Sequence, residues 1–485
     1  MTNIIKNSLY NLGGSLFSSI FLFISFIMFS RLLGPEPLGI FQIQLLIITV
    51  LGVIFISFID YSLAYNISKS KSPEEKVEFF SISLFLSSLI GITIAVLMFF
   101  LDKTILSILN IPIDFLQESL ILFHYFIIYF LVQIFLSNVR ALLFANNNFK
   151  SRFYLTLLQR FSISFFSVIL YLLTMRLSFI SLGFLIGSIP SIIYAFVLLY
   201  KSKYLTFSFV RLDNIRKFFN YGKFTFAINV GNQIQTFFDS FLISILLGPI
   251  QVGFYSVAYN LFNELNRIPK LVSESAFPKL LSSDRTYSKI IFNKILKYLS
   301  FVQIPLSIVL LVFSKEIITL IYGSTYSPSF IVFSILSSSL LFSHYWVSNI
   351  ILLSNNKPLK MTLSLFFSII FNILLNLFLI PKYGIIGAAV STLISFVVYY
   401  SISSLYLGKE YFYKKNFLRD SLLIFFSLIF LIFLKYLFLK ILSFPETIGL
   451  LIVVTFYLIS YTYLLYSIFI TKEDKEFFIS LLNLK

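Results

Sequence analysis

Long apolar segments recur along the whole chain, separated only by short polar loops. Fourteen of them have about the 20 residues that a helix needs to cross the hydrocarbon core of a bilayer. Hydrophobic residues make up 58% of the chain and charged residues 12%, about half the ~25% usual in soluble domains. Because lipid cannot satisfy backbone polar groups, we expect an all-α integral membrane protein. The expected spans are 8–33, 40–66, 79–101, 117–144, 153–175, 179–200, 218–247, 251–277, 290–313, 329–353, 361–380, 385–407, 420–439 and 447–470.

Basic residues are concentrated in alternate loops rather than spread along the chain. Lys69, Lys71 and Lys76 precede the third span, for example, whereas the next loop carries only Lys103. Cytoplasmic loops are enriched in Lys and Arg, so we expect a multi-pass protein of the cell (cytoplasmic or inner) membrane with both termini in the cytoplasm. The net charge of +17 therefore reflects orientation in the lipid bilayer, and nucleic acid is not an expected partner. The chain has no cysteine, which excludes disulfides and thiolate metal sites.

A sequence repeat divides the chain into two similar halves. The turn Leu32-Leu33-Gly34-Pro35 recurs 214 residues later as Leu246-Leu247-Gly248-Pro249, and Ala145-Asn146-Asn147 has an echo in Ser354-Asn355-Asn356. Chance similarity between Gly-Pro turns is the alternative explanation. A duplication predicts two six-helix bundles related by a pseudo-two-fold axis along the membrane normal. The predicted domains are residues 1–205, residues 206–410, and the two additional transmembrane helices with a cytoplasmic tail in residues 411–485.

Three segments give the chain a family resemblance. They are residues 30–42, residues 239–278 with their second Leu-Leu-Gly-Pro turn, and residues 372–392. With these segments the chain resembles the Wzx-type oligosaccharide flippases of polysaccharide biosynthesis, including those for O-antigen repeat units. That family belongs to the superfamily of MATE exporters and lipid II flippases. Fourteen spans favour the flippases, because MATE exporters usually have twelve.

The resemblance implies a function. A protein of this family carries an isoprenoid-diphosphate-linked oligosaccharide from the cytoplasmic to the outer face of the membrane, for cell-surface polysaccharide biosynthesis. The implied mechanism is alternating access, in which the two bundles rock about a central site. The implied partners are this lipid-linked oligosaccharide, a polysaccharide polymerase and glycosyltransferases.

Two neighbouring spans carry polar stripes. In the seventh span Asn229, Asn232 and Gln233 share one helical face, and in the eighth Asn260 and Asn263 do so. Such stripes predict the wall of a hydrated cavity, with hydrogen bonding between helices as the alternative.

Five basic residues lie inside or at the cytoplasmic end of predicted spans. They are Arg140, Arg152, Arg160, Arg267 and Lys270. Together they predict a cationic cavity for the diphosphate, since arginine binds phosphate through its planar fork. The alternative is that four of them only follow the orientation rule. Arg160 lies too deep in its span for that explanation, because charge at this depth is costly and usually functional.

Two intramembrane carboxylates are candidates for ion coupling. Asp239 and Glu264 could bind a driving proton or sodium ion, and no other cofactor is expected. Asp239 could equally pair with Arg31 as a structural latch. His124 and His344 are interpreted as packing residues, because a lone intramembrane histidine is more often a packing residue than a relay.

Enzyme functions are disfavoured by missing motifs. The chain has no Walker A loop, no Gly-x-Ser-x-Gly elbow, and only two histidines, far apart, so no metal site is expected. Two alternatives to a flippase remain. A MATE-like multidrug or organic cation antiporter predicts an acidic cavity, and a membrane-bound glycosyltransferase or ligase predicts acidic clusters in a large loop.

Overall fold

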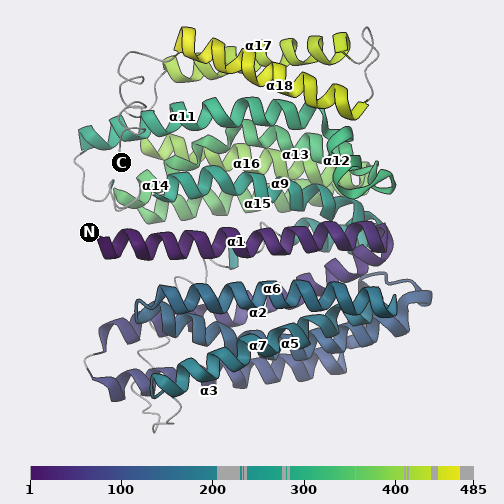
Figure 1. Ribbon diagram of the computed structural model, residues 1–485, viewed down its shortest axis with the longest axis vertical. Helices are drawn as coiled ribbons and strands as arrows, with labels where there is room; N and C mark the ends of the chain where they lie inside the picture. The colour runs from purple at the N-terminus through teal and green to yellow at the C-terminus, as the bar shows by residue number, and fades with distance from the viewer. Residues whose placement is uncertain are drawn as a thin grey trace. The chain divides into compact units, whose positions relative to one another are not determined.

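The computed structural model describes residues 2–70, 72–204, 230–231, 233, 237–275, 280, 285–355, 357–408, 411, 414–438 and 446–469. All regular elements within these ranges are helices (Figure 1), and no strand occurs among the described residues. Ten of the described helices are long and apolar enough to cross a membrane. The predicted all-α membrane fold is therefore confirmed, whereas the number of fourteen spans stays a prediction.

The first half of the chain forms six long helices and one short one. They are α1 (Thr2–Leu33), α2 (Pro35–Lys69), α3 (Pro73–Phe100), α4 (Asp102–Ile108), α5 (Ile113–Ala145), α6 (Phe149–Thr174) and α7 (Ser178–Lys201). The spans expected in this region coincide with the long helices. The short α4 was not predicted, because it lies in a loop between spans.

In the second half of the chain, short helices and 3-10 turns separate the long helices more often than in the first half. The elements of the second half are α9 (Pro249–Ser275), α11 (Arg285–Val312), α12 (Ser314–Tyr322), η1 (Ser324–Tyr326), α13 (Ser329–Ser343), η2 (His344–Trp346), α14 (Val347–Ser354), α15 (Pro358–Tyr383), α16 (Ile385–Leu407), α17 (Lys414–Tyr436), α18 (Glu446–Leu464) and η5 (Leu465–Phe469). The expected tenth span is one run of three pieces, because a turn of 3-10 helix separates α13 from α14.

Local sequence signals set several helix starts. Ser72 caps α3 by accepting a hydrogen bond from the backbone N–H of Glu75, and Asn148 caps α6 by accepting one from Ser151. Such side chains satisfy N–H groups that have no partner within the helix. Proline stands at the start of α2 and of α3, where its missing N–H costs nothing.

Packing contacts divide the chain into two compact units. The first packing unit comprises Met1–Val257 and Asn372–Ala388, and the second comprises Ala258–Phe371 and Ala389–Lys485. These units are defined by contacts, not by the sequence repeat, so the predicted domain boundaries remain a prediction.

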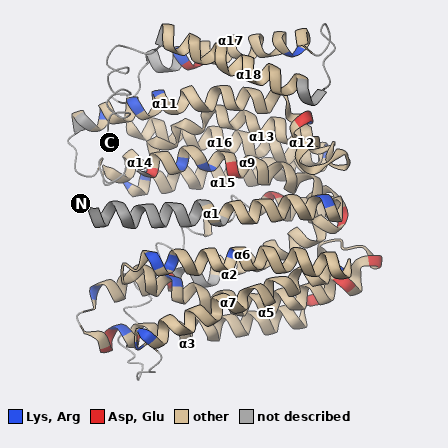
Figure 2. Ribbon diagram, viewed as in Figure 1, with Lys and Arg blue, Asp and Glu red and all other residues tan. Residues whose placement is uncertain are grey.

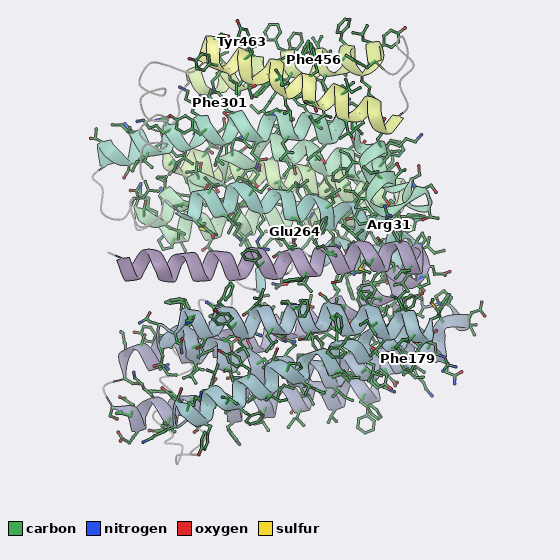
Figure 3. The ribbon with its side chains drawn as sticks, in the orientation of Figure 1. Arg31, Phe179, Glu264, Phe301, Phe456 and Tyr463 are labelled. Carbon is green, nitrogen blue, oxygen red and sulfur yellow. The ribbon has the colours of Figure 1, made fainter. Side chains whose placement is uncertain are left out.

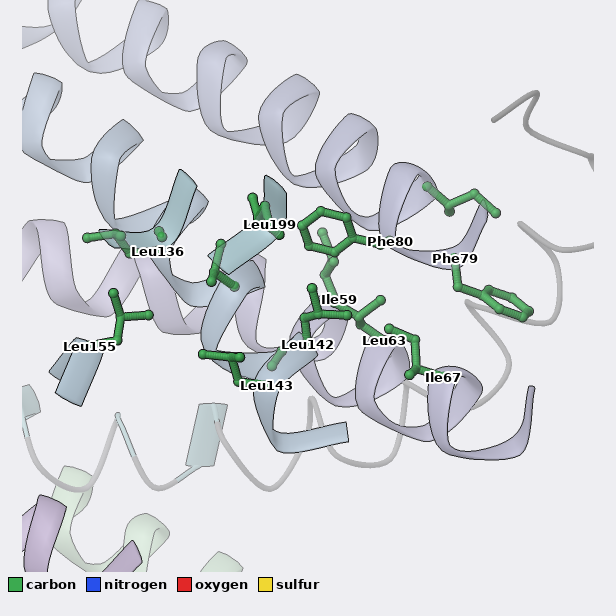
Figure 4. Packing of buried hydrophobic residues seen from close by; sticks show 14 residues of the cluster. Ile59, Leu63, Ile67, Phe79, Phe80, Leu136, Leu142, Leu143, Leu155 and Leu199 are labelled. Carbon is green, nitrogen blue, oxygen red and sulfur yellow. The ribbon is translucent and has the colours of Figure 1, made fainter. Parts of the chain in front are cut away.

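In the first packing unit, α6 packs on α7 and α1, and α5 packs on α2, α3 and α7 (Figure 1). Figure 4 shows a core at one end of this bundle, where side chains of five helices meet. Ile59 and Leu63 of α2, Phe80 of α3 and Leu136 of α5 are almost fully buried there. Because lipid is as apolar as leucine, such packing and interhelical hydrogen bonds stabilise the bundle.

The two Gly-Pro turns of the repeat adopt the same backbone conformation. Gly34 has φ 78° and Gly248 has φ 82°, a left-handed region that favours glycine. A proline follows each glycine and begins the next helix, α2 or α9. The repeated sequence therefore produces a repeated local structure, as a duplication predicts.

In the second packing unit, α11 packs on α13, α14 and α17, and α17 packs on α18. A second core joins α11 to the C-terminal pair, with Ile304, Leu431 and Tyr457 fully buried. In the last turn of α17, Lys435 forms an ion pair of 2.7 Å with Glu316 of α12. The two helices outside the repeat are thus firmly part of this unit.

Candidate functional site

A polar and charged cluster lies inside the first packing unit, contributed by α2, α5 and α6. On α5 the side chains of Tyr129, Gln133, Ser137 and Arg140 follow one another at steps of four, four and three residues, which places them on one helical face. On α6, Gln159 and Arg160 follow Arg152 by two helical turns, and α2 contributes Asp60. We call these eight residues the arginine cluster.

Hydrogen bonds connect the three helices of the arginine cluster. Arg140 Nη1 of α5 donates to Gln159 Oε1 of α6 over 2.8 Å. The Ser137 hydroxyl of α5 donates to the Asp60 carboxylate of α2. The cluster is therefore built by tertiary packing, with one polar link from α5 to each neighbouring helix.

Positive charge dominates the arginine cluster. Arg140 lies within electrostatic range of Arg160, Arg152 and Asp60, and Asp60 lies within range of Arg140 and Arg152. The Tyr129 hydroxyl lies within range of Arg160 and Arg140. The cluster thus holds three guanidinium groups and one carboxylate, of which Arg140 and Arg152 interact with Asp60, and like charges in a membrane bundle repel each other strongly. An anion bound there would relieve this repulsion.

Some polar atoms of the cluster have no hydrogen-bond partner in the part of the chain that the structure describes. They are Asp60 Oδ1, Gln133 Nε2 and Gln159 Nε2, and the Gln159 side chain is only 1% exposed. Buried polar groups are almost always hydrogen-bonded, so such atoms call for a ligand or water. The two free amide groups are hydrogen-bond donors, which suits a phosphate or a sugar hydroxyl.

The structure brings together three of the five predicted basic residues. Arg140, Arg152 and Arg160 meet in the arginine cluster, and all three are half-buried. Arg267 and Lys270 lie on α9 in the second packing unit. There Arg267 forms an ion pair of 3.8 Å with Glu264, and Lys270 Nζ lies 5.0 Å from the ring centroid of Trp346.

The structure describes three of the five polar residues that were predicted to line a cavity. On α9, Asn263 is exposed and Asn260 is half-buried, whereas the neighbouring Leu261 and Phe262 are buried, so the polar residues occupy a separate face. Gln233 is half-buried. Asn229 and Asn232 lie outside the described residues.

The two predicted ion-coupling carboxylates have different environments. Asp239 is fully buried, and it accepts hydrogen bonds from Tyr255 Oη over 2.7 Å and from Asn376 Nδ2 over 2.6 Å. Asn376 also donates to Asn372 over 3.1 Å, as expected of residues that hold helices together. Glu264, labelled in Figure 3, is half-buried beside Arg267.

Sequence reasoning missed Asp60, Tyr129, Gln133, Ser137 and Gln159 as members of the cluster. The regular spacing of polar residues along 129–140 was a usable signal, of the same kind as the stripe in the seventh span. No sequence signal places Asp60 or Gln159 beside that face, because their contacts are tertiary. Among the described residues, no group of three or more His, Asp or Glu side chains could hold a metal ion.

Comparisons with known proteins agree on a membrane transporter fold. A family model described as polysaccharide biosynthesis protein matches residues 4–283, more than half of the chain. The protein named "Probable low-salt glycan biosynthesis flippase Agl15" of Haloferax volcanii is 28% identical over 201 residues, which cover 40% of this chain and 42% of that protein. The capsular polysaccharide biosynthesis protein CapF of Staphylococcus aureus is 28% identical over 241 residues, covering 47% and 59%. The chain thus aligns with about half the length of these relatives.

Two solved structures have the same fold. The lipid II flippase MurJ in an inward closed conformation superposes with a TM-score of 0.77 at 21% identity, covering 94% of this chain and 98% of that one. An inward-facing multidrug resistance MATE transporter gives a TM-score of 0.68 at 13% identity, covering 84% and 95%. These likenesses confirm the predicted fold class.

Proposed function

Because the chain belongs to the polysaccharide biosynthesis protein family, we propose that it is a flippase, which moves an isoprenoid-diphosphate-linked oligosaccharide from the cytoplasmic to the outer face of the cell membrane. The family predicted from the sequence resemblance is confirmed by the matching family model. The arginine cluster is the observation that carries the substrate class, because it places three guanidinium groups and free amide donors within a membrane bundle.

The chemistry of the substrate fits the arginine cluster. A diphosphate carries charge on several oxygens, and arginine binds such oxygens through paired, charge-assisted hydrogen bonds. Arg140 and Arg160 repel each other, so binding of an anion stabilises both. In this proposal the isoprenoid chain stays in the lipid.

The expected orientation places the arginine cluster near the cytoplasmic side. Figure 2 shows a gathering of Lys and Arg at the end of the first packing unit where α6 begins, together with the acidic residues of the first turn of α3, and both signs of charge at the opposite end. By the positive-inside rule the basic end faces the cytoplasm, with both termini there. The substrate then enters from the side on which it is made, and alternating access releases it outside. A reporter at the C-terminus tests this, since an extracytoplasmic signal contradicts the orientation.

A gradient of protons or sodium is the proposed driving force, with Asp239 and Glu264 as candidate binding residues. Asp239 already receives two hydrogen bonds, which fits a latch as well as a coupling site. Transport that ignores both gradients would exclude the coupling role. The proposed partners in the cell are glycosyltransferases that build the substrate and a polymerase that consumes it.

An organic cation antiporter is the second candidate, because the MATE fold is shared. It requires an acidic cavity, and in the arginine cluster the arginines outnumber the carboxylates. A membrane-bound glycosyltransferase or ligase has less support, because the matching relatives are named for transport or biosynthesis of glycans and the fold is that of transporters.

Reconstitution distinguishes these functions. Purified protein in lipid vesicles is given a fluorescent isoprenoid-diphosphate sugar, and the fraction in each leaflet is measured with a membrane-impermeant quencher. We expect equilibration between leaflets only with the protein present. Export of an organic cation without movement of the glycolipid would support the antiporter, and a change in the sugar itself would support an enzyme.

A further inference from the structure

A break interrupts the helical run Ser329–Ser354 in the second packing unit, and a buried histidine lies at the break. Helix α13 ends at Ser343, the 3-10 turn η2 covers His344–Trp346, and α14 begins at Val347. Short 3-10 stretches inside a helix often mark a functional hinge. His344 is 1% exposed, so water does not solvate its ring.

An ion pair on α17 lies directly against this histidine. Asp420 Oδ1 accepts hydrogen bonds from Arg419 Nε over 2.9 Å and from Arg419 Nη2 over 2.7 Å. The other oxygen, Asp420 Oδ2, lies 3.4 Å from His344 Nε2. Arg419 also donates to Ser300 Oγ of α11 over 3.0 Å and lies 5.3 Å from the ring centroid of Phe301, which Figure 3 labels. We call His344, Arg419 and Asp420 the His-Asp-Arg cluster.

Both ring nitrogens of His344 lack a hydrogen-bond partner among the described residues. A buried polar atom without a partner is unfavourable, so the site holds a proton acceptor whose hydrogen bonding is incomplete. The nearest acceptor, Asp420 Oδ2, lies just beyond the range of a good hydrogen bond.

Other titratable groups near the cluster come from each packed element. Tyr345 of η2 and Tyr461 of α18 interact electrostatically with the Arg419–Asp420 ion pair. On α11, Lys297 Nζ lies 5.9 Å from the ring centroid of Phe301, which Arg419 also contacts. Neither tyrosine carries charge near neutral pH, so Asp420 is the negative group that His344 faces.

A proton bound by His344 would lie opposite an acidic side chain. Arg419 already neutralises Asp420, and the cluster has no net charge while His344 is neutral. A proton on His344 Nε2 creates a cation 3.4 Å from Asp420 Oδ2. The resulting charge-assisted hydrogen bond is shorter and stronger than a neutral one. It would tie the helix break to α17 more tightly.

We propose that His344 and Asp420 form a proton-binding site, which links the break between α13 and α14 to α17 and slows transport when the proton is bound. The effect on transport depends on the proposed flippase function, whereas binding of the proton does not. The site is separate from Asp239 and Glu264, the residues that the sequence suggested for ion coupling.

Nuclear magnetic resonance tests the proton site directly, because the chain contains only two histidines. The protein is labelled with nitrogen-15 in its histidine rings and studied in lipid nanodiscs, and His124→Gln identifies the signals of His344. We expect the His344 signals to pass through one reversible transition on acidification. Signals that stay constant on acidification overturn the proposal, and so does a transition that Asp420→Asn leaves unchanged.

The pH dependence of transport tests the consequence. In vesicles at equal pH on both sides, we expect native transport to slow about tenfold on acidification, the ratio that one stronger hydrogen bond produces. His344→Gln should remove this response. His124→Gln is the matched control, because His124 also lies beside a carboxylate, 2.8 Å from Asp102, but in the first packing unit; it should keep the response.

The failures of the two proposals are distinguishable. A His344 transition in vesicles that move no glycolipid supports the proton site and contradicts the flippase. Glycolipid transport with the same pH response in His344→Gln as in the native protein supports the flippase and overturns the regulatory role of His344.

Discussion

Gly39 and Gly253 pack reciprocally against each other's turn. A Cβ atom at Gly39 would lie 1.9 Å from the backbone oxygen of Pro249, and one at Gly253 would lie 1.9 Å from that of Pro35. Gly253 follows Gly39 by 214 residues, and Pro249 follows Pro35 by the same number. The sequence repeat therefore relates the two contacts to each other. A two-fold axis produces such self-complementary pairs.

Alanine at either glycine should therefore force two backbones apart. We expect Gly39→Ala and Gly253→Ala each to lower the free energy of unfolding by about 1–3 kcal/mol or more, as overpacking does. Thermal unfolding in detergent measures this. Gly52→Ala is the control, because a Cβ there would lie an ordinary 3.7 Å from the Phe130 ring. Equal melting temperatures for all three variants and the native protein would contradict the close approach.

Asp60 should weaken the binding of an anion to the arginine cluster, because it offsets part of its positive charge. Asp60→Asn removes the carboxylate that offsets Arg140 and Arg152, so we expect the diphosphate to bind about tenfold more tightly, a change of about 1.4 kcal/mol. Release, and therefore turnover, should become slower. Equilibrium binding and vesicle transport measure the two effects. The control is Asp114→Asn, because Asp114 is an exposed carboxylate at the start of α5; this variant should change neither binding nor transport. Equal binding by Asp60→Asn and by the native protein would exclude the proposed role of Asp60.

Asp239 should contribute to stability through its two hydrogen bonds. Tyr255→Phe removes the donor 2.7 Å from Asp239, and hydrogen bonds to charged groups contribute about 1.5–3 kcal/mol. We expect this variant to unfold at lower temperature and to keep its response to ion gradients. Asp239→Asn should also unfold earlier, and it should lose the gradient response if the carboxylate couples transport to an ion. An unchanged response in Asp239→Asn would leave the residue a purely structural role.

The α17 helix should be held to the second packing unit by its ion pair. Lys435 Nζ contacts Glu316 over 2.7 Å and donates to the backbone oxygen of Val312 over 2.8 Å. Lys435→Met breaks both and leaves Glu316 without its partner, so we expect faster proteolytic cleavage of α17 with little change in substrate binding. Lys382→Met, an exposed residue at the end of α15, is the control. The same cleavage rate in both variants would contradict the anchoring role.

Apolar segment length and basic loops predicted the class of fold, because lipid imposes strong and simple constraints on a chain. The expected spans 179–200 and 385–407 match α7 and α16 to within one residue at each end, whereas α2 and α5 extend up to five residues beyond theirs. The repeat of Gly34 and Gly248 was also readable, since a left-handed turn needs glycine. The break at His344 was not, because Ser343–Trp346 differs little in composition from a continuous helix.

The sequence predicted the candidate site from the position of charged residues within the spans, not from contacts between helices. Arg160 attracted attention because a charge in the middle of a span is costly, and Arg140 does lie beside it in the arginine cluster. Asp60 and Gln159 were missed, because their role comes from helices that meet only in three dimensions. Asp420 was missed for the same reason, since only the fold places it against His344.

Binding of a fluorescent isoprenoid-diphosphate sugar to the purified protein tests the central claim most directly. Removal of one charged hydrogen-bond donor costs about 1.5–3 kcal/mol, so Arg160→Ala should weaken binding by about ten- to a hundredfold. Arg176→Ala, an exposed arginine at the opposite end of α6, should bind as the native protein does. Native affinity in a folded, membrane-inserted Arg160→Ala variant would contradict the account.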